Sequence, residues 1–129
     1  MIALAPQALT LTVLVVDDDD AVRRLITREL EEGGFRVLTA ADGQEALTVI
    51  EQSAIGVHLV VCDLVMPRLD GYQLASRLAE LPNAPEIIFI TAFRSDLELD
   101  RLPVVLTKPF HLTDLRTAVQ LVLQKRACT

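Results

Sequence analysis

The sequence predicts an α/β fold, a doubly wound five-stranded parallel sheet with helices on both faces. Strand-like apolar runs alternate five times with segments of helical periodicity, and the connections between them are short. Several of the runs are almost continuously apolar, which is typical of strands covered on both sides. Such alternation implies parallel strands joined by right-handed crossovers. One domain therefore fills the chain.

The predicted strands are rich in β-branched and aliphatic side chains and end at turn residues. Their ranges are 11–16, 35–40, 57–63, 86–91 and 104–107. The second run alternates somewhat between polar and apolar residues, which favours a position near an edge of the sheet. The third run lies between Gly56 and Pro67 and ends on a carboxylate, Asp63.

The predicted helices place apolar residues on one face. Their ranges are 21–32, 44–52, 72–81, 95–102 and 112–125, the fourth being at most a short helix. Asp19 or Asp20 suits the N-cap of the first helix, whose apolar face includes Leu25, and Gly33-Gly34 ends it. We expect residues 1–10 to be a flexible leader, residues 11–126 the folded domain and residues 127–129 a tail.

Composition excludes several classes of partner. The 129 residues carry a formal charge of −6, whereas direct nucleic-acid contact requires clustered basic side chains. No apolar run reaches the roughly 18 residues of a membrane-spanning helix. The two cysteines, Cys62 and Cys128, are not spaced as a disulfide framework, so we expect reduced thiols and a cytoplasmic location.

Each strand of a parallel sheet delivers its last residues to one edge, where ligands gather. Asp17 and Asp18 follow the first strand, Asp63 ends the third, Thr91 ends the fourth and Lys108 follows the fifth. A single aspartate after a strand more often caps the next turn. Three converging carboxylates, however, repel one another unless a cation lies between them, and oxygen ligands suit Mg²⁺. A lysine and a hydroxyl are the partners that a phosphoryl oxygen requires.

These strand ends resemble the receiver domain of two-component response regulators. The similarity spans about residues 11–125, and four motifs carry it: Val15–Asp18, Asp63–Pro67 with Asp70-Gly71, Thr91-Ala92, and Lys108–Phe110. The resemblance implies the (βα)5 flavodoxin-like receiver fold.

The resemblance also implies a role for each site residue. Asp63 would be the phosphoacceptor, and Mg²⁺ would be held by Asp17, Asp18, Asp63 and the backbone carbonyl of Val65. Thr91 and Lys108 would contact the phosphoryl group. The donor would be a sensor histidine kinase or a histidine phosphotransfer protein, and phosphorylation would change partner binding. Such a domain promotes its own phosphorylation and dephosphorylation but is not a turnover enzyme on external substrates.

Two features depart from the family pattern. Val105 stands where many members carry an aromatic switch residue, and the interval from Thr91 to Lys108 is shorter than usual. The shortened interval resembles a subgroup found in hybrid kinases and alphaproteobacterial stress regulators. We expect the last strand, the shortened fourth segment and the final helix to form the partner surface, and the last strand and final helix to form that of a homodimer. The downstream partner has no signature in the sequence.

The main alternative is an interaction module that keeps the receiver fold and signals without phosphorylation. Retention of the five site residues favours the phosphoacceptor, whereas the missing aromatic keeps the alternative open. Other classes lack their motifs. The chain has no G-x-x-x-x-G-K-[ST] loop of a P-loop ATPase and no dinucleotide-binding G-x-G-x-x-G, and Val65 replaces the second carboxylate of a dehalogenase-type phosphatase.

Overall fold

A single parallel sheet forms the centre of the computed structural model, which describes residues 11–53, 56–66, 68–92 and 105–127. The strand order is β2-β1-β3-β4-β5, with every neighbouring pair parallel. The bounds are β1 Thr12–Val16, β2 Arg36–Ala40, β3 Leu59–Asp63, β4 Glu86–Thr91 and β5 Val105–Thr107. The predicted sheet is confirmed, including the edge position of β2.

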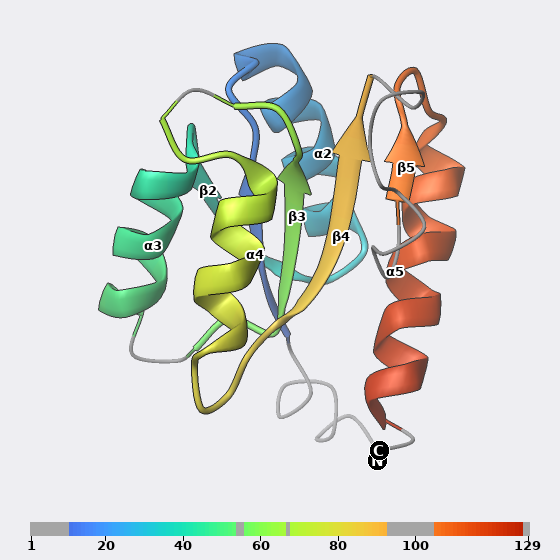
Figure 1. Ribbon diagram of the computed structural model, residues 1–129. Coiled ribbons are helices and arrows are strands. Elements are labelled where there is room, and N and C mark those ends of the chain that lie inside the picture. Colours follow the sequence, from blue (N-terminus) through green and yellow to red (C-terminus); the bar gives the residue numbers. More distant parts are fainter. Residues whose placement is uncertain (1–10, 54–55, 67, 93–104, 128–129) are drawn as a thin grey trace.

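Four helices are described, and they cover both faces of the sheet. They are α2 Asp20–Glu32, α3 Gly43–Gln52, α4 Gly71–Ala79 and α5 Leu112–Ala127. Figure 1 shows α3 and α4 against one face, with α2 and α5 on the other. The short helix predicted over 95–102 lies outside the described residues. Among the described helices, none has both the length and the apolar character required to cross a bilayer.

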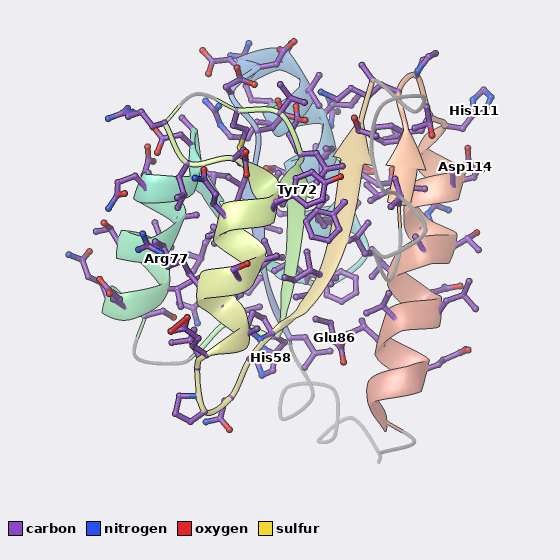
Figure 2. All side chains as sticks on the ribbon, viewed as in Figure 1. His58, Tyr72, Arg77, Glu86, His111 and Asp114 are labelled. Carbon is purple, nitrogen blue, oxygen red and sulfur yellow. The ribbon has the colours of Figure 1, made fainter. Side chains whose placement is uncertain are left out.

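Alternating strand residues supply the two halves of the core. Val13 and Val15 of β1 face α2 and α5, whereas Leu14 and Val16 face α3 and α4. The fully buried residues that the helices contribute include Ile26, Leu115, Ala46 and Leu78. Figure 2 shows side chains filling the space between helices and sheet. Leu25, expected on the apolar face of the first helix, is instead 51% exposed, because the buried stripe of α2 is narrower than the apolar pattern.

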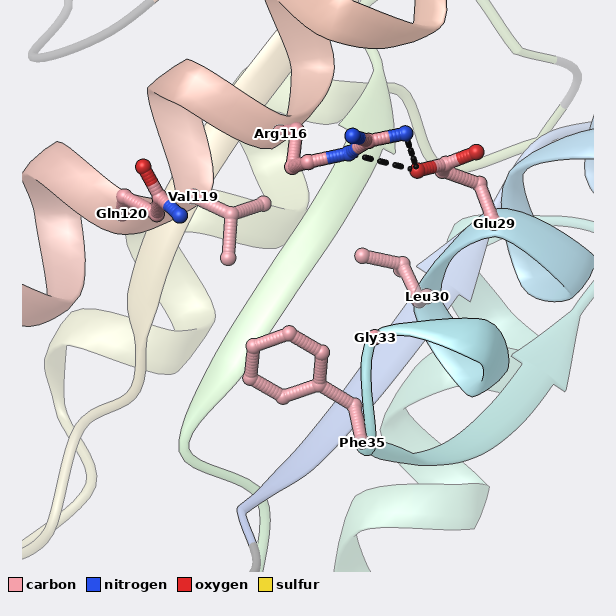
Figure 3. Close-up of a pocket in the computed structure, with 7 residues that line it drawn as sticks. All are labelled: Glu29, Leu30, Gly33, Phe35, Arg116, Val119 and Gln120. Carbon is pink, nitrogen blue, oxygen red and sulfur yellow. Dashed lines mark hydrogen bonds and ion pairs between the residues drawn. The ribbon is translucent and has the colours of Figure 1, made fainter.

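An ion pair joins the two helices on one face of the sheet. Glu29 of α2 accepts from Arg116 of α5, with Oε2 at 2.8 Å from Nε and 2.6 Å from Nη2 (Figure 3). The pair lies at the rim of a small cavity of about 170 Å³. Leu30, Phe35 and Val119 form its apolar wall. This contact links α5 to α2 above the apolar cluster that the two helices share.

Candidate functional site

Three aspartates converge at the carboxyl end of the sheet. β1 and β3 are neighbours with Val16 opposite Cys62, so the residues that follow in each strand lie side by side. One carboxylate oxygen each from Asp17, Asp18 and Asp63 lie within 4.8 Å of one another. Asp17 and Asp63 are buried and Asp18 is exposed, which leaves the cluster open to solvent on one side.

Lys108, which directly follows β5, brings a positive charge to this cluster. Its Nζ lies 3.0 Å from Asp63 Oδ2 and 3.2 Å from Asp17 Oδ2, so one ammonium group bridges two carboxylates. The side chain extends from the end of β5 past β4. Its backbone N–H donates to the carbonyl of Thr91 at 2.7 Å, and the peptide bond to Pro109 is cis.

Backbone hydrogen bonds connect the strand ends to one another. The N–H of Asp17 donates to Ala40 at the end of β2, at 3.2 Å, and the N–H of Leu64 donates to Ile90 of β4, at 2.9 Å. Together with the bond from Lys108 to Thr91, these contacts align the ends of neighbouring strands, and so they position the site residues relative to one another.

Burial and neighbouring charges shift the pKa values of Asp17 and Lys108. Burial raises the pKa of Asp17, and the charge of Asp63 adds to this effect, while a hydrogen bond from the Asp19 N–H and the charge of Lys108 oppose it. Burial lowers the pKa of Lys108, but the hydrogen bond and charge of Asp63, with those of Asp17, outweigh it and leave the pKa raised. The ionised form of Asp17 is therefore incompletely compensated by Lys108, and a further cation near these oxygens would stabilise it.

Thr91 and Val65 lie at the same edge. Thr91 is completely buried at the end of β4, next to β5. Val65 has a side chain 53% exposed, and its N–H donates to Asp63 Oδ1 at 3.0 Å. Both oxygens of the Asp63 carboxylate are thereby oriented, Oδ1 by Val65 and Oδ2 by Lys108. The structure thus gathers the predicted site residues at one end of the sheet.

Three residues near the site were missed from the sequence. Arg23 of α2 donates to the backbone carbonyl of Asp17 at 2.7 Å and pairs with Asp20. Asp42 caps α3 and pairs with Arg68. The spacing of Asp42 and a glutamate three residues later is a recognisable helix-start pattern, whereas nothing local indicates the partner of Arg68.

The two histidines lie away from the carboxylates. His58 is at the amino end of β3, opposite the strand tips, where its Nδ1 accepts from the N–H of Thr12 at 3.0 Å (Figure 2). His111 is exposed at the start of α5. Cys62, adjacent to Asp63, is buried in the core on the α3 and α4 side, as its place in the strand predicts, and burial raises the pKa of its thiol.

Comparison with known proteins agrees with this geometry. Residues 13–120 match the family described as the response regulator receiver domain. The response regulator receiver protein CpdR of Brucella abortus is 34% identical over 116 residues, covering 86% of this chain and 95% of CpdR. The sensor kinase CckA of the same organism is 38% identical over 120 residues, which cover 89% of this chain but only 13% of CckA. The response regulator TrrA from Thermotoga maritima has a solved structure with a TM-score of 0.76 and 31% identity, covering 88% of this chain and 99% of TrrA.

The chain belongs to the response regulator receiver domain family. It is a receiver domain of two-component signalling, with the flavodoxin-like arrangement of that family. Receiver domains take phosphoryl groups from histidine kinases or phosphotransfer proteins, and they act as signalling domains rather than as turnover enzymes. Several relatives are much longer than the match, and the chain spans about half of the probable transcriptional regulators ycf27 of Porphyridium aerugineum and Cyanophora paradoxa.

Proposed function

We propose that Asp63 is the phosphoacceptor of this receiver domain. A carboxylate oxygen of Asp63 attacks the phosphorus of a phosphohistidine, the P–N bond breaks, and an acyl phosphate forms on Asp63 while the histidine is released. The observation that carries the proposal is the position of the carboxylate. It ends a central strand, lies within reach of two further carboxylates and accepts a hydrogen bond from Lys108.

We propose Mg²⁺ as the cofactor, held by Asp17, Asp18, Asp63 and the backbone carbonyl of Val65. Three carboxylates provide oxygen ligands, which suit a hard cation such as Mg²⁺ that retains several waters. The raised pKa of Asp17 supports the same conclusion, because a cation there would offset the cost of burying the charge. When bound, Mg²⁺ neutralises charge on the phosphoryl oxygens. The related TrrA was crystallised with Mg²⁺ and BeF, which is consistent with this assignment.

Lys108 and Thr91 are proposed to hold the phosphoryl group. Lys108 already donates to the carboxylate that would carry it, so a small movement of the ammonium group would transfer this hydrogen bond to a phosphoryl oxygen. Thr91 is placed at the same edge, with its backbone bonded to Lys108. Chemistry of this kind depends chiefly on position and charge.

The partner surface is proposed to include β5 and α5, and this surface would also serve a homodimer. Among the described residues, β5 is an edge strand of three residues that pairs with β4 alone, and Leu121 on α5 is 60% exposed. Amide NMR spectra with and without beryllofluoride test the surface, since identical spectra over β5 and α5 would contradict it.

A phosphohistidine donor and the buried free thiol of Cys62 favour a cytoplasmic setting.

Intact-mass measurement after incubation with Mg²⁺ and acetyl phosphate tests the acceptor. We expect a single phosphoryl adduct on the wild type and none on Asp63→Asn. Asp114→Asn serves as the control, because this carboxylate is exposed on α5, outside the aspartate cluster, and its variant should keep the adduct. Absence of an adduct with acetyl phosphate and with a phosphorylated kinase would favour the non-phosphorylated interaction module.

A further inference from the structure

Arg68 adopts a backbone conformation that arginine rarely takes. Its φ is +68°, and among the described residues it is the one non-glycine with a positive φ. Left-handed conformations are unfavourable for residues with a Cβ, and they persist where surrounding contacts impose them. Glycine would adopt this φ without strain, so the arginine side chain needs a separate explanation.

The side chain of Arg68 reaches the start of α3. Its Nη2 lies 2.7 Å from Oδ2 of Asp42, a carboxylate whose side chain is only 7% exposed. The other oxygen of Asp42 is also occupied, because Oδ1 accepts from the N–H of Glu45 at 2.9 Å and caps the helix. Asp42 is therefore a fixed anchor, and Arg68 is tied to it.

The backbone beside this ion pair is packed without spare room. A Cβ added at Gly43 would lie 2.4 Å from the carbonyl oxygen of Leu69 and 2.9 Å from its Cβ. The first residue of α3 thus lies directly against the segment between β3 and α4. The ion pair and this close contact act at neighbouring points on the same two segments.

Hydrogen bonds hold the beginning of the β3–α4 segment and join its two ends. Next to β3, the N–H of Val65 donates to Asp63 Oδ1 at 3.0 Å. Next to α4, the N–H of Gly71 donates to the carbonyl of Leu64 at 3.0 Å. The pair of Arg68 and Asp42 adds an attachment three residues after Val65, beside the close contact between Gly43 and Leu69.

We propose that Arg68 and Asp42 are positioning residues of the metal site. By tying the β3–α4 segment to the capped end of α3, they hold the Val65 carbonyl where Mg²⁺ would use it. This inference rests on the proposed metal site. Groups that hydrogen-bond directly to a metal ligand typically change metal affinity by about 10–100-fold when they are removed. Arg68 and Asp42 act one step further away, through the backbone, so we expect an effect at the lower end of this range.

Two substitutions separate this role from folding. Arg68→Gly removes the charge and relieves the backbone strain, and Asp42→Asn removes the charge and keeps a good N-cap. Both variants should therefore stay folded. Titration with Mg²⁺, followed by calorimetry, should show about tenfold weaker binding for each variant. The double variant should be weakened by about the same factor, because the two residues form one contact.

A purely electrostatic effect differs from the positioning role in the Arg68→Gly variant and in the double variant. Loss of the Arg68 cation would tighten Mg²⁺ binding, loss of the Asp42 anion would weaken it, and the double variant would return close to the wild type. A matched control is Arg116→Gln, which removes one positive charge from the distant pair with Glu29 and should leave Mg²⁺ binding unchanged. As a second readout, the Val65 amide should exchange with solvent faster in Arg68→Gly than in the wild type.

The outcomes are distinguishable. If the wild type binds Mg²⁺ and accepts a phosphoryl group, but Arg68→Gly binds Mg²⁺ equally or more tightly, the positioning role is wrong and the proposed function stands. If the wild type binds no Mg²⁺, the metal site itself is refuted and the positioning role with it.

Discussion

Gly71 offers a direct test of how tightly the acceptor strand is held. This glycine is the first residue of α4, where its N–H donates to the carbonyl of Leu64. A Cβ at this position would lie 2.8 Å from both the Asp63 carbonyl oxygen and the Leu64 Cα, and both atoms belong to the backbone. We predict that Gly71→Ala displaces the end of β3 and lowers stability.

The size of the effect follows from two opposing contributions. Ordinary carbon contacts are about 3.5 Å or longer, so the backbone must retreat by more than about half an ångström, and such overpacking costs about 1–3 kcal/mol. Replacing glycine by alanine also restricts the unfolded chain, which contributes about 0.4–1 kcal/mol in the opposite direction. The expected net loss in the free energy of unfolding is about 1–2 kcal/mol.

Urea denaturation monitored by circular dichroism measures this loss. Gly33→Ala is the control, since a Cβ there meets its nearest atoms at 3.4 and 3.6 Å and the φ of −82° suits alanine. The control should be neutral or slightly stabilised. A Gly71→Ala protein as stable as the wild type, with the amide chemical shifts of Asp63 and Leu64 unchanged, would refute the reasoning.

Two further predictions concern the site lysine and the core. The pKa of Lys108 is raised in the folded protein above its ordinary value of 10.5, so its contribution to stability is complete below pH 10.5 and is lost as the pH rises through the folded pKa. Urea titrations at increasing pH should show this alkaline loss of stability in the wild type but not in Lys108→Met. The same dependence of stability on pH in both proteins would contradict the ion pairs. Leu78→Ala should lower the free energy of unfolding by about 2–5 kcal/mol, because Leu78 is fully buried. Leu25 is half exposed on α2, so Leu25→Ala should lower it by less than about 1 kcal/mol. Equal losses for the two variants in chemical denaturation would show that the assigned core is wrong.

The regular elements of this fold were predictable because each has a strong local pattern. The run of valines in β1 and the spacing of Leu115, Val119 and Val122 in α5 indicate their structure without reference to the rest of the chain. The convergence of Asp17, Asp63 and Lys108 was predictable as well, since topology alone sends the ends of parallel strands to one edge.

The contacts between loops were not predictable in the same way. The pairing of Arg68 with Asp42 joins residues 26 positions apart and depends on a left-handed backbone that no local pattern in the sequence indicates. The exposure of Leu25 depends on how much of α2 its neighbours cover, and in the assembled structure Ile26 and Leu30 are buried whereas Leu25 is not. Such features follow from the assembled structure and from no single segment.

The hydrogen bonds between strand ends have a mechanical consequence. Asp17 is bonded to the end of β2, Leu64 to β4 and Lys108 to Thr91, so backbone hydrogen bonds run across the strands at their carboxyl ends. We therefore expect a displacement of the Asp63 backbone to affect the neighbouring strand ends as well as its own loop. β5 is the shortest of the described strands and has a single described neighbour. We expect Val105–Thr107 to shift more readily than the central strands in response to such a displacement.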